Sequence, residues 1–429
     1  MSKRLFITLA VLLVASIPIA VVLLFSSMVP VFWDSSFPAG AKYLLRQVVS
    51  GLDSTPLIAI ATFVLSGIIM ARGKISEKIF NVFAYFIGSK TAGMPCAVVV
   101  TCLFYGAISG SAPATVAAVG AMTVPILLDL GYEKKFCTAL IAMSGGLGVI
   151  IPPSIPFIIF AMISGASVGD LFIAGIFPGI LIAVCLMGYS YYYCKKHGED
   201  KEKLKVYAGE IKGKGLGRLI NEGIWALLSP VIVLGGIYSG IVTPTEASVI
   251  SVIYSLIITI FVYKTLNISE MYSIFCESVK AYAPLLFVLG AATALARTLT
   301  LMQLPQAISV MIGNLFDNKI LLLLAINILL LFVGMIIDGS SAILILTPIL
   351  LPIVSTYGVN PVHFGVIMVV NLAIGFVTPP VGVNLYIASG LTGVTVLDIS
   401  KRVIPFILAT LVALMLITYI PKISLLLVG

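Results

Sequence analysis

Charged residues are scarce in this sequence. Aspartate, glutamate, lysine and arginine together make up 10% of its 429 residues, whereas hydrophobic residues make up 60%. A soluble domain carries about 25% charged residues, so a chain this apolar cannot present a wetted surface on all sides. The scarcity of charge excludes an ordinary water-soluble fold and indicates that lipid is the main solvent of the chain.

Residues that carry enzyme chemistry are also few. The two histidines, His197 and His363, lie far apart, and none of the six cysteines forms a C-x-x-C pair, so the sequence offers no metal-binding cluster. There is no Ser-His-Asp arrangement and no nucleotide-binding G-x-x-x-x-G-K-[ST] motif; the stretch GSKT at 88–91 only resembles its end. We therefore predict that the chain is not an enzyme, uses no nucleotide or organic cofactor, and draws its energy from an ion gradient.

The chain has a net charge of +8, and its densest cluster of charged residues lies in one segment. Between residues 195 and 218, lysines are mixed with Glu199, Asp200, Glu202 and Glu210. Mixed signs make a poor track for nucleic-acid phosphates, whereas a lysine-rich loop between apolar segments is typical of the cytoplasmic side of a membrane protein. We predict no nucleic-acid partner and place this loop in the cytoplasm.

Apolar runs of membrane-spanning length recur along the chain, since a helix crosses a bilayer with about 20 apolar residues. The first run is far longer than the core of a signal peptide, which has about 7–15 residues, so we predict one transmembrane helix there. Continuous runs cover approximately residues 5–32, 56–72, 171–194, 224–242, 246–264, 283–303 and 403–427.

Four further apolar regions are interrupted by glycine, proline and serine. They are 93–128, broken at SGSAP; 136–165, broken at GGLG and PPS; 320–356, broken at DGSS; and 363–390, broken at Gly375 and TPP. The breaks come in matched pairs, because Pro152-Pro153 recurs as Pro379-Pro380 and Gly148 recurs as Gly375 at the same offset. The chain is therefore interpreted as a duplication.

The predicted topology is an inverted repeat. If 93–128 and 320–356 are re-entrant hairpins they cross nothing, and the crossings between them are odd in number, so the second copy enters from the opposite side, as in secondary transporters. An Ile-Ser-Glu triplet in each copy, at 75–77 and 268–270, opens a predicted interfacial helix. The predicted fold class is an all-α polytopic membrane protein with inverted repeats, two re-entrant helical hairpins and two discontinuous helices.

The four breaks indicate a binding site, because irregular backbone in lipid is costly unless its polar groups find partners. A helix that ends inside the membrane frees carbonyl oxygens at its C-terminus and N–H groups at the next N-terminus. Carbonyl and hydroxyl oxygens suit a hard cation, and free N–H groups at a positive helix end suit a carboxylate. The breaks therefore predict bound Na⁺ beside an organic anion near the membrane midplane.

Two charged residues inside apolar spans have alternative roles. Asp338, at the second hairpin break, either ligates a cation, carries a proton, or caps the following half-helix. Arg297 either extends its side chain to the membrane interface or binds a substrate carboxylate through its guanidinium group.

Four segments follow one another along the chain: GLDSTPLIAIATFVLSGIIMARGKISEKIF, SGSAPATVAAVGAMTVPIL, GVIIPPSIPFIIFAMISGASVGDLFIAGIFPGI and TPPVGVNLYIASGLTGV. Together they resemble the large membrane subunit of tripartite ATP-independent periplasmic (TRAP) transporters. The resemblance implies a bacterial inner-membrane protein with an elevator-type ion-transporter-like fold. It also implies two protein partners, namely a small four-helix membrane subunit and a soluble periplasmic substrate-binding protein, and an organic acid substrate of the sialic acid or C4-dicarboxylate class.

The same resemblance implies a domain division and two sets of site residues. A transport domain at 91–195 and 283–402 would move against a scaffold at 1–90, 196–282 and 403–429. The implied Na⁺ sites comprise Ser109, Gly110, Ser111, Gly145 and Gly148, and their counterparts Asp338, Gly339, Ser340, Gly375 and Thr378. The implied substrate site lies between them, near Ser111, Pro153, Ser154, Ser341, Thr378, Pro380 and Asn384, with Arg297 as a further candidate.

The predicted function is Na⁺-coupled import of an organic acid, with sialic acid favoured, and two alternatives stay open. A stand-alone Na⁺/carboxylate symporter would work without a binding protein. An ion channel would use the broken helices as a filter, although the sequence shows no ring of repeated filter residues.

Overall fold

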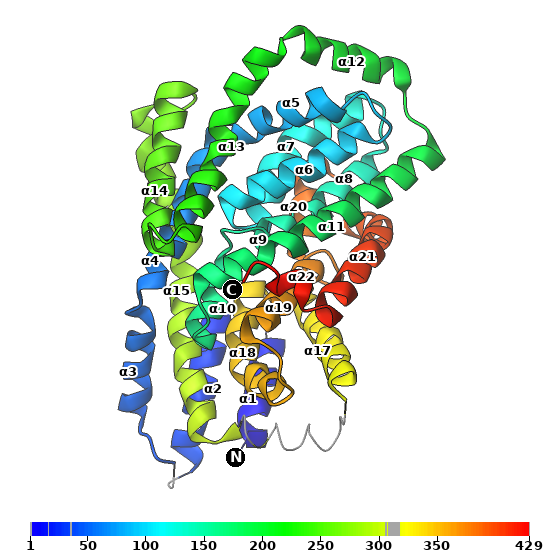
Figure 1. Ribbon diagram of the computed structural model, residues 1–429. Coiled ribbons are helices and arrows are strands. Elements are labelled where there is room, and N and C mark those ends of the chain that lie inside the picture. Colours follow the sequence, from blue (N-terminus) through cyan, green and yellow to red (C-terminus); the bar gives the residue numbers. More distant parts are fainter. Residues whose placement is uncertain (1, 16, 35–36, 305–306, 308–317, 429) are drawn as a thin grey trace.

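The computed structural model describes residues 2–15, 17–34, 37–304, 307 and 318–428, and within these ranges the chain is helical and contains no β-strand (Figure 1). The α-helices, with two short segments of other helix type, are α1 (Ser2–Val14), α2 (Ile19–Trp33), α3 (Ala41–Leu52), α4 (Thr55–Arg72), α5 (Ile75–Ile87), α6 (Gly93–Ser109), α7 (Ala112–Asp129), α8 (Lys134–Ser144), α9 (Leu147–Ile150), α10 (Ile155–Ser164), α11 (Val168–His197), α12 (Lys201–Gly213), α13 (Leu216–Tyr238), α14 (Pro244–Ile257), η1 (Ile258–Val262), η2 (Ile268–Glu270), α15 (Met271–Leu301), α17 (Lys319–Gly334), α18 (Gly339–Thr356), α19 (Pro361–Gly375), α20 (Val383–Thr392), α21 (Val396–Tyr419) and α22 (Lys422–Leu425).

Six of the seven predicted continuous spans correspond to long apolar helices. Among the described residues, eight helices are long and apolar enough to cross a membrane, including α4, α11, α13 and α21. A helix satisfies its own backbone groups, which is what the hydrocarbon core of a bilayer demands. The chain is therefore a multi-pass membrane protein.

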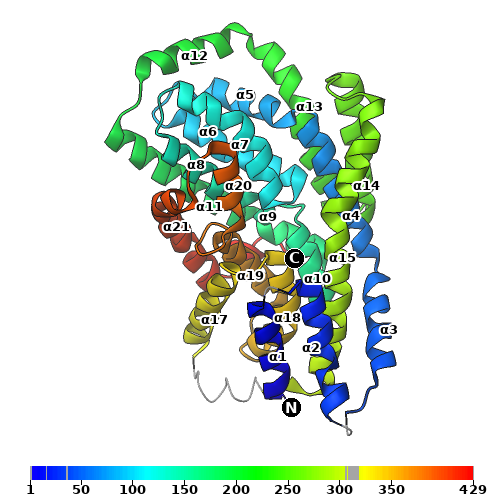
Figure 2. The ribbon, with the colours of Figure 1, turned by 180° about the vertical axis from the view of Figure 1, so that it is seen from behind.

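The prediction of a single first helix over 5–32 is wrong. The chain forms α1 and α2, which pack side by side (Figures 1 and 2). Pro18 immediately precedes α2. Proline has no backbone N–H and restricts the residue before it, so it favours a helix start over a helix interior. Each of the two helices is shorter than a full membrane span.

The two predicted interfacial helices have different outcomes. The first is a separate helix, α5, which packs against α6 and α13. The second is wrong, because the triplet at 268–270 is a single 3₁₀ turn that runs directly into α15, a continuous helix of 31 residues. The basic segment at 195–218 also contains a helix, α12, which packs on α5.

The first hairpin, α6–α7, has both of its ends bound to one carboxylate. The Ala92 N–H donates to both oxygens of Glu199, at 3.1 and 3.0 Å, and the Tyr132 hydroxyl donates to Glu199 Oε1 at 2.5 Å. Burial and then this hydrogen bond raise the pKa of Tyr132. Glu199 therefore holds the entry and the exit of the hairpin at the same side of the molecule, next to the basic segment.

The second hairpin, α17–α18, is closed in the same way at the opposite side. Lys319 Nζ, at the start of α17, donates to the Gly358 carbonyl just beyond α18, at 3.3 Å. Figures 1 and 2 show the ends of α6 and α7 beside α5 and α12, whereas the ends of α17 and α18 lie at the other extreme of the molecule. The two hairpins therefore point in opposite directions.

The domain division implied by the resemblance stays a prediction, and two helices make most of their contacts across its boundaries. The helix α15 packs mainly against α2, α3 and α4, although 283–402 was assigned to the transport domain. The helix α21 packs against α8, α11, α19 and α20, although 403–429 was assigned to the scaffold. We use "scaffold side" below for α2, α3, α4, α13, α14 and α15, and "transport side" for the hairpins, the broken helices, α11 and α21.

Candidate functional site

The tip of the first hairpin is a cluster of oxygen atoms. Helix α6 ends at Gly110, which adopts the left-handed conformation (φ 60°), and Ser111 is the N-cap of α7. The Ser109 hydroxyl lies 2.9 Å from the Thr115 hydroxyl, and Thr115 Oγ1 donates to the Ser111 carbonyl at 2.8 Å. Two hydroxyls and one carbonyl thus converge within a single turn. Sequence reasoning missed Thr115, which is recognisable as a hydroxyl one turn after the N-cap.

The first broken helix, α8–α9–α10, lies directly against this cluster. A Cβ atom added to Gly148 would lie 2.4 Å from Thr115 Oγ1 and 2.7 Å from the Ser111 carbonyl oxygen, and a Cβ on Gly106 would lie 2.7 Å from the Cα of Gly148. These distances are below any real contact, so only glycine fits at either position. The break itself contains a cis peptide bond between Pro152 and Pro153.

A backbone hydrogen bond joins this break to the hairpin tip. The Ile155 N–H donates to the Gly110 carbonyl at 3.3 Å. A Cβ on Gly110 would lie 2.9 Å from the Pro153 carbonyl oxygen. The structure therefore brings together all five residues of the first predicted Na⁺ site, since Gly145 also packs against Val116 in the turn that contains Thr115.

The second unit repeats this construction. The Cα of Gly334 on α17 meets Gly375 at the end of α19, as Gly106 meets Gly148. The Val381 N–H, just after the cis Pro379-Pro380 bond, donates to the Met335 carbonyl at 3.1 Å. In both units a glycine of the hairpin contacts a glycine of the broken helix. In both units, too, a backbone N–H just after the cis peptide bond donates to a carbonyl oxygen of the hairpin, from Ile155 in the first unit and from Val381 in the second. The matched pairs read from the sequence therefore occupy matched positions in space.

Asp338 is the N-cap of α18. Its Oδ2 accepts hydrogen bonds from the Ser341 N–H, at 3.1 Å, and from the Ser341 hydroxyl, at 3.3 Å. Its Oδ1 has no protein partner among the described residues, and the side chain is exposed. The capping role proposed from the sequence is thus present, and one carboxylate oxygen stays available for a cation.

The other residues of the second predicted Na⁺ site are brought together less tightly. Gly339 lies against the ring of Phe376, the neighbour of Gly375. The Thr378 hydroxyl, just beyond the end of α19, donates to the Ile374 carbonyl of that helix at 2.8 Å. Ser340 is buried. Among the described residues, no three His, Cys, Asp or Glu side chains are arranged to hold a metal ion, so ligands for a cation here would be mainly hydroxyls and carbonyls.

The predicted substrate residues fall into two groups. Thr378 and Pro380 are partly accessible, and Ser111 lines a cavity. Ser154 and Pro153 are buried, and the Ser154 hydroxyl is already engaged, because it donates to the Val149 carbonyl at 2.5 Å and caps α10.

Asn384 links the two units. Its Nδ2 donates to the Ala142 carbonyl of α8 at 3.1 Å, while its Oδ1 is buried without a protein partner. The broken helices also meet directly, since a Cβ on Gly146 would lie 3.5 Å from the Ala373 carbonyl oxygen. A buried, unpaired acceptor at this junction is a costly group in the absence of a ligand or water.

Arg297 is not brought together with the other candidates. Its Nε donates to the Tyr43 hydroxyl of α3 at 2.7 Å. It lies 20 residues beyond Glu277 on α15, which corresponds to about 30 Å along the helix axis. The structure therefore places Arg297 near the end of α15 that is remote from the basic segment.

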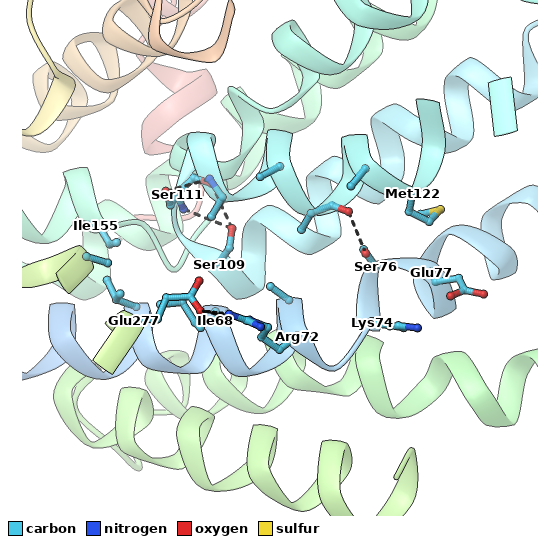
Figure 3. Close-up of a pocket in the computed structure, with 18 of the residues that line it drawn as sticks. Ile68, Arg72, Lys74, Ser76, Glu77, Ser109, Ser111, Met122, Ile155 and Glu277 are labelled. Carbon is cyan, nitrogen blue, oxygen red and sulfur yellow. Dashed lines mark hydrogen bonds and ion pairs between the residues drawn. The ribbon is translucent and has the colours of Figure 1, made fainter. Parts of the chain in front are cut away.

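A cavity of about 670 Å³ reaches the first hairpin tip from the scaffold side (Figure 3). Ser109, Ser111 and Ile155 are among the residues that line it. Gly67 of α4 also lines it, and a Cβ at this glycine would lie 3.1 Å from the Cα of Ser109. The hairpin tip thus rests directly on the scaffold side.

The lining of this cavity also carries charge. Arg72 and Glu277 form an ion pair at 2.7 Å, and Lys74 and Glu77 line the same space. Nearby, Glu222 of α13 binds both Lys78 and Arg218, at 2.8 and 2.9 Å. Arg218 belongs to the basic segment, so the cavity mouth lies on the side that the lysine-rich loop marks as cytoplasmic.

This multi-pass helical chain, with its two oppositely directed hairpins and two broken helices, has transport permeases as its homologues. The sequence profile of the family described as "Tripartite ATP-independent periplasmic transporter, DctM component" matches residues 6–423. The chain belongs to this family and is a TRAP transporter large permease of the bacterial inner membrane.

Individual relatives agree with this assignment. The isethionate TRAP permease DctMQ of Oleidesulfovibrio alaskensis is 42% identical over 98% of this chain, which spans 65% of the length of that relative. The C4-dicarboxylate permease DctM of Pseudomonas aeruginosa is 36% identical over 90% of both chains. The sialic acid permease SiaM of Vibrio cholerae is 34% identical over 97% of this chain and 96% of its own.

Two solved structures share the fold at low sequence identity. The YdaH transporter of Alcanivorax borkumensis superposes with a TM-score of 0.61 at 15% identity, covering 93% of this chain and 96% of that one. MtrF of Neisseria gonorrhoeae superposes with a TM-score of 0.64 at 12% identity, covering 96% and 94%. These likenesses confirm the predicted all-α polytopic membrane fold, whereas the re-entrant course of the two hairpins stays a prediction.

Proposed function

We propose that this chain imports an organic anion across the inner membrane, driven by co-transported Na⁺. One observation carries the proposal: two hairpin tips each meet a broken helix at a glycine–glycine contact, in opposite orientations. The first junction presents the Ser109 and Thr115 hydroxyls and the Ser111 carbonyl. The second presents the free Oδ1 of Asp338. Hard oxygen ligands of this kind suit Na⁺, and the half-helix N-termini between them suit an anion.

The proposed substrate class is a small organic oxyanion. The names of the relatives include isethionate, C4-dicarboxylates, sialic acid and 2,3-diketo-L-gulonate. These are carboxylates or a sulfonate, and each offers oxygen atoms to backbone N–H groups at a helix start. We place the anion near Ser111 and Thr378, which are partly accessible, with Asn384 at the junction of the two units as a further candidate.

The proposed movement is an elevator in which the transport side slides against the scaffold side. Its partners are a small four-helix membrane subunit and a periplasmic binding protein, as in the family to which the chain belongs. The contact between Gly67 and Ser109 is one of the points where the two sides touch. The alternative is a stand-alone symporter, which would bind Na⁺ and the anion at the same site but would need no binding protein.

Gly67 gives this movement a test. Replacing Gly67 with leucine is expected to reduce uptake about tenfold or more, because overpacking costs about 1–3 kcal/mol and would displace the hairpin tip from α4. Gly235 on α13 is the matched control, since nothing lies within 4 Å of its added Cβ. Uptake by both variants, normalised to folded protein in detergent, is the measurement. Equal activity of the two variants contradicts the proposed sliding contact.

The energetics suit two Na⁺ per monoanion. This stoichiometry moves one net positive charge inward, which is worth about 2.3 kcal/mol at 100 mV. A tenfold Na⁺ gradient adds about 1.4 kcal/mol per ion. The sum of about 5 kcal/mol supports accumulation of several thousand-fold.

Transport in proteoliposomes tests the proposed function. Vesicles would contain this chain with its small membrane subunit, and the panel of radiolabelled acids would be isethionate, succinate, sialic acid and 2,3-diketo-L-gulonate. We expect uptake of one of them only with both an inward Na⁺ gradient and the matching binding protein. Uptake that does not require the binding protein favours the stand-alone symporter. Uptake that does not depend on the Na⁺ gradient overturns the proposal.

A further inference from the structure

The Arg72–Glu277 pair at the cavity mouth leaves much of the guanidinium free. Arg72 Nε and Nη2 both donate to the same oxygen, Glu277 Oε2, at 3.2 and 2.7 Å. A guanidinium carries five N–H donors, so three remain, two on Nη1 and one on Nη2. They have no protein partner among the described residues. These donors form the edge that grips a carboxylate or a sulfonate with two parallel hydrogen bonds, so Arg72 can hold an oxyanion while it stays paired with Glu277.

The position of Arg72 fits an anion that leaves the site toward the cytoplasm. The cavity runs from Ser109 and Ser111 to Arg72, and Figure 3 shows the ion pair across the cavity from the tip serines. The small side chains of α7 that line one wall keep the space open; they are Ala114, Ala117, Ala118 and Ala121. The mouth lies beside the basic segment, on the predicted cytoplasmic side. An anion released from the first hairpin tip into this cavity therefore passes Arg72.

We propose that Arg72 binds the departing organic anion at the cytoplasmic mouth of the cavity, and that Glu277 keeps this binding weak. The proposal rests on the transport function proposed above. An exit site must attract its ligand and also let it go. Arg72 supplies the attraction, and the negative charge of Glu277, held on the same guanidinium, opposes the incoming anion. Arg72 is thus a substrate-contacting residue of the release step.

Two substitutions that break the same ion pair distinguish this role from a purely structural one. Arg72→Gln removes the guanidinium that binds the anion. Glu277→Gln keeps the guanidinium and removes the carboxylate that competes with the anion for it. A simple strut between α4 and α15 would be weakened equally by either change. The proposal instead predicts opposite shifts in the affinity of the cytoplasmic face. Lys74→Gln is the matched control, because Lys74 lines the same cavity but holds no ion pair among the described residues.

The experiment is exchange in right-side-out proteoliposomes, with the acid of the panel that the wild-type chain imports. The lumenal, cytoplasmic-face concentration of unlabelled acid is varied, and entry of external label is measured. We expect the lumenal half-saturating concentration to rise about tenfold in Arg72→Gln, the value of one charge-assisted hydrogen bond. It should fall several-fold in Glu277→Gln and change little in Lys74→Gln, with external half-saturation unaltered in all three.

If the lumenal half-saturating concentration shifts in the same direction in Arg72→Gln and Glu277→Gln, or in neither, the proposal is overturned. The ion pair then only stabilises the contact between α4 and α15. Failure of the wild-type chain to import any acid of the panel with Na⁺ would instead refute the proposed transport function. The two failures are therefore separable in one set of vesicles.

Discussion

Replacing Gly148 with alanine is expected to abolish Na⁺-driven uptake, a loss of at least about 100-fold. The added Cβ would lie 2.4 Å from Thr115 Oγ1 and 2.7 Å from the Ser111 carbonyl oxygen. The carbonyl belongs to the backbone of the hairpin tip and cannot rotate away, so the methyl group must push α9 off the tip. The oxygen cluster that we assign to Na⁺ would then be dispersed. A displacement of about 1 Å in a catalytic or binding geometry costs about 100-fold.

Gly188 on α11 provides the matched control for this substitution. It also lies within a helix, but nothing lies within 4 Å of its added Cβ. Gly188→Ala should therefore retain wild-type uptake and slightly raise thermal stability, because glycine costs about 0.5–1 kcal/mol relative to alanine inside a helix. Uptake and thermal unfolding of both variants would be compared. Wild-type uptake by Gly148→Ala would remove the first junction from the coupling site.

Replacing Asp338 with asparagine is expected to separate the two roles of this residue. Asparagine is as good an N-cap as aspartate, so Asp338→Asn should keep the hydrogen bond to the Ser341 N–H and leave the melting temperature nearly unchanged. It removes the negative charge and one carboxylate oxygen, so the Na⁺ concentration for half-maximal uptake should rise about 10–100-fold. Such a rise corresponds to about 1.4–2.8 kcal/mol.

Asp338→Ala is the companion variant. It should lose Na⁺ affinity and also stability, because loss of an N-cap costs about 0.5–2 kcal/mol. The measurements are Na⁺ dependence of uptake and thermal unfolding in detergent. An unchanged Na⁺ dependence in Asp338→Asn would show that the side chain acts only as a cap.

The breaks in the helices were predictable because their signals are local. Glycine and proline interrupt a helix whatever its neighbours are. The hairpin tips and the Pro-Pro breaks therefore lie where the sequence predicts them. The repeat added a second, independent signal, since Gly148 and Gly375 share an offset and meet equivalent glycines. Sequence alone could therefore identify the serines and glycines that meet at the first hairpin tip, although it missed Thr115; their role as a cation site stays a prediction.

The errors come from features that composition does not encode. An apolar run looks the same whether it is one helix or two, and Pro18 alone did not identify the turn between α1 and α2. The polar triplet at 268–270 marks the start of a helix, but it does not show whether this helix ends before the next apolar run or continues through it, as α15 does. Composition also leaves open which helices α15 and α21 contact, because this depends on which apolar faces contact protein and which contact lipid. Both kinds of face carry the same residues in a membrane protein.

Several site residues also required three dimensions. Glu199 follows Gly198 in a charged loop, and nothing in that loop reveals that its carboxylate binds both ends of a distant hairpin. Arg72 and Glu277 are far apart in sequence and meet only because α4 packs against α15. Ser154 is predicted as a ligand by its position at a break, and only the structure shows that its buried hydroxyl caps α10.

The reversal potential of uptake tests the central claim most directly. In proteoliposomes with fixed substrate concentrations on both sides, the membrane potential at which net flux stops would be measured at several Na⁺ gradients. Two Na⁺ per monoanion predict a shift of about 120 mV for each tenfold change in the Na⁺ ratio, because about 2.8 kcal/mol is balanced by one net charge. A reversal potential that does not move with Na⁺ would contradict the assignment of the two junctions as coupled cation sites.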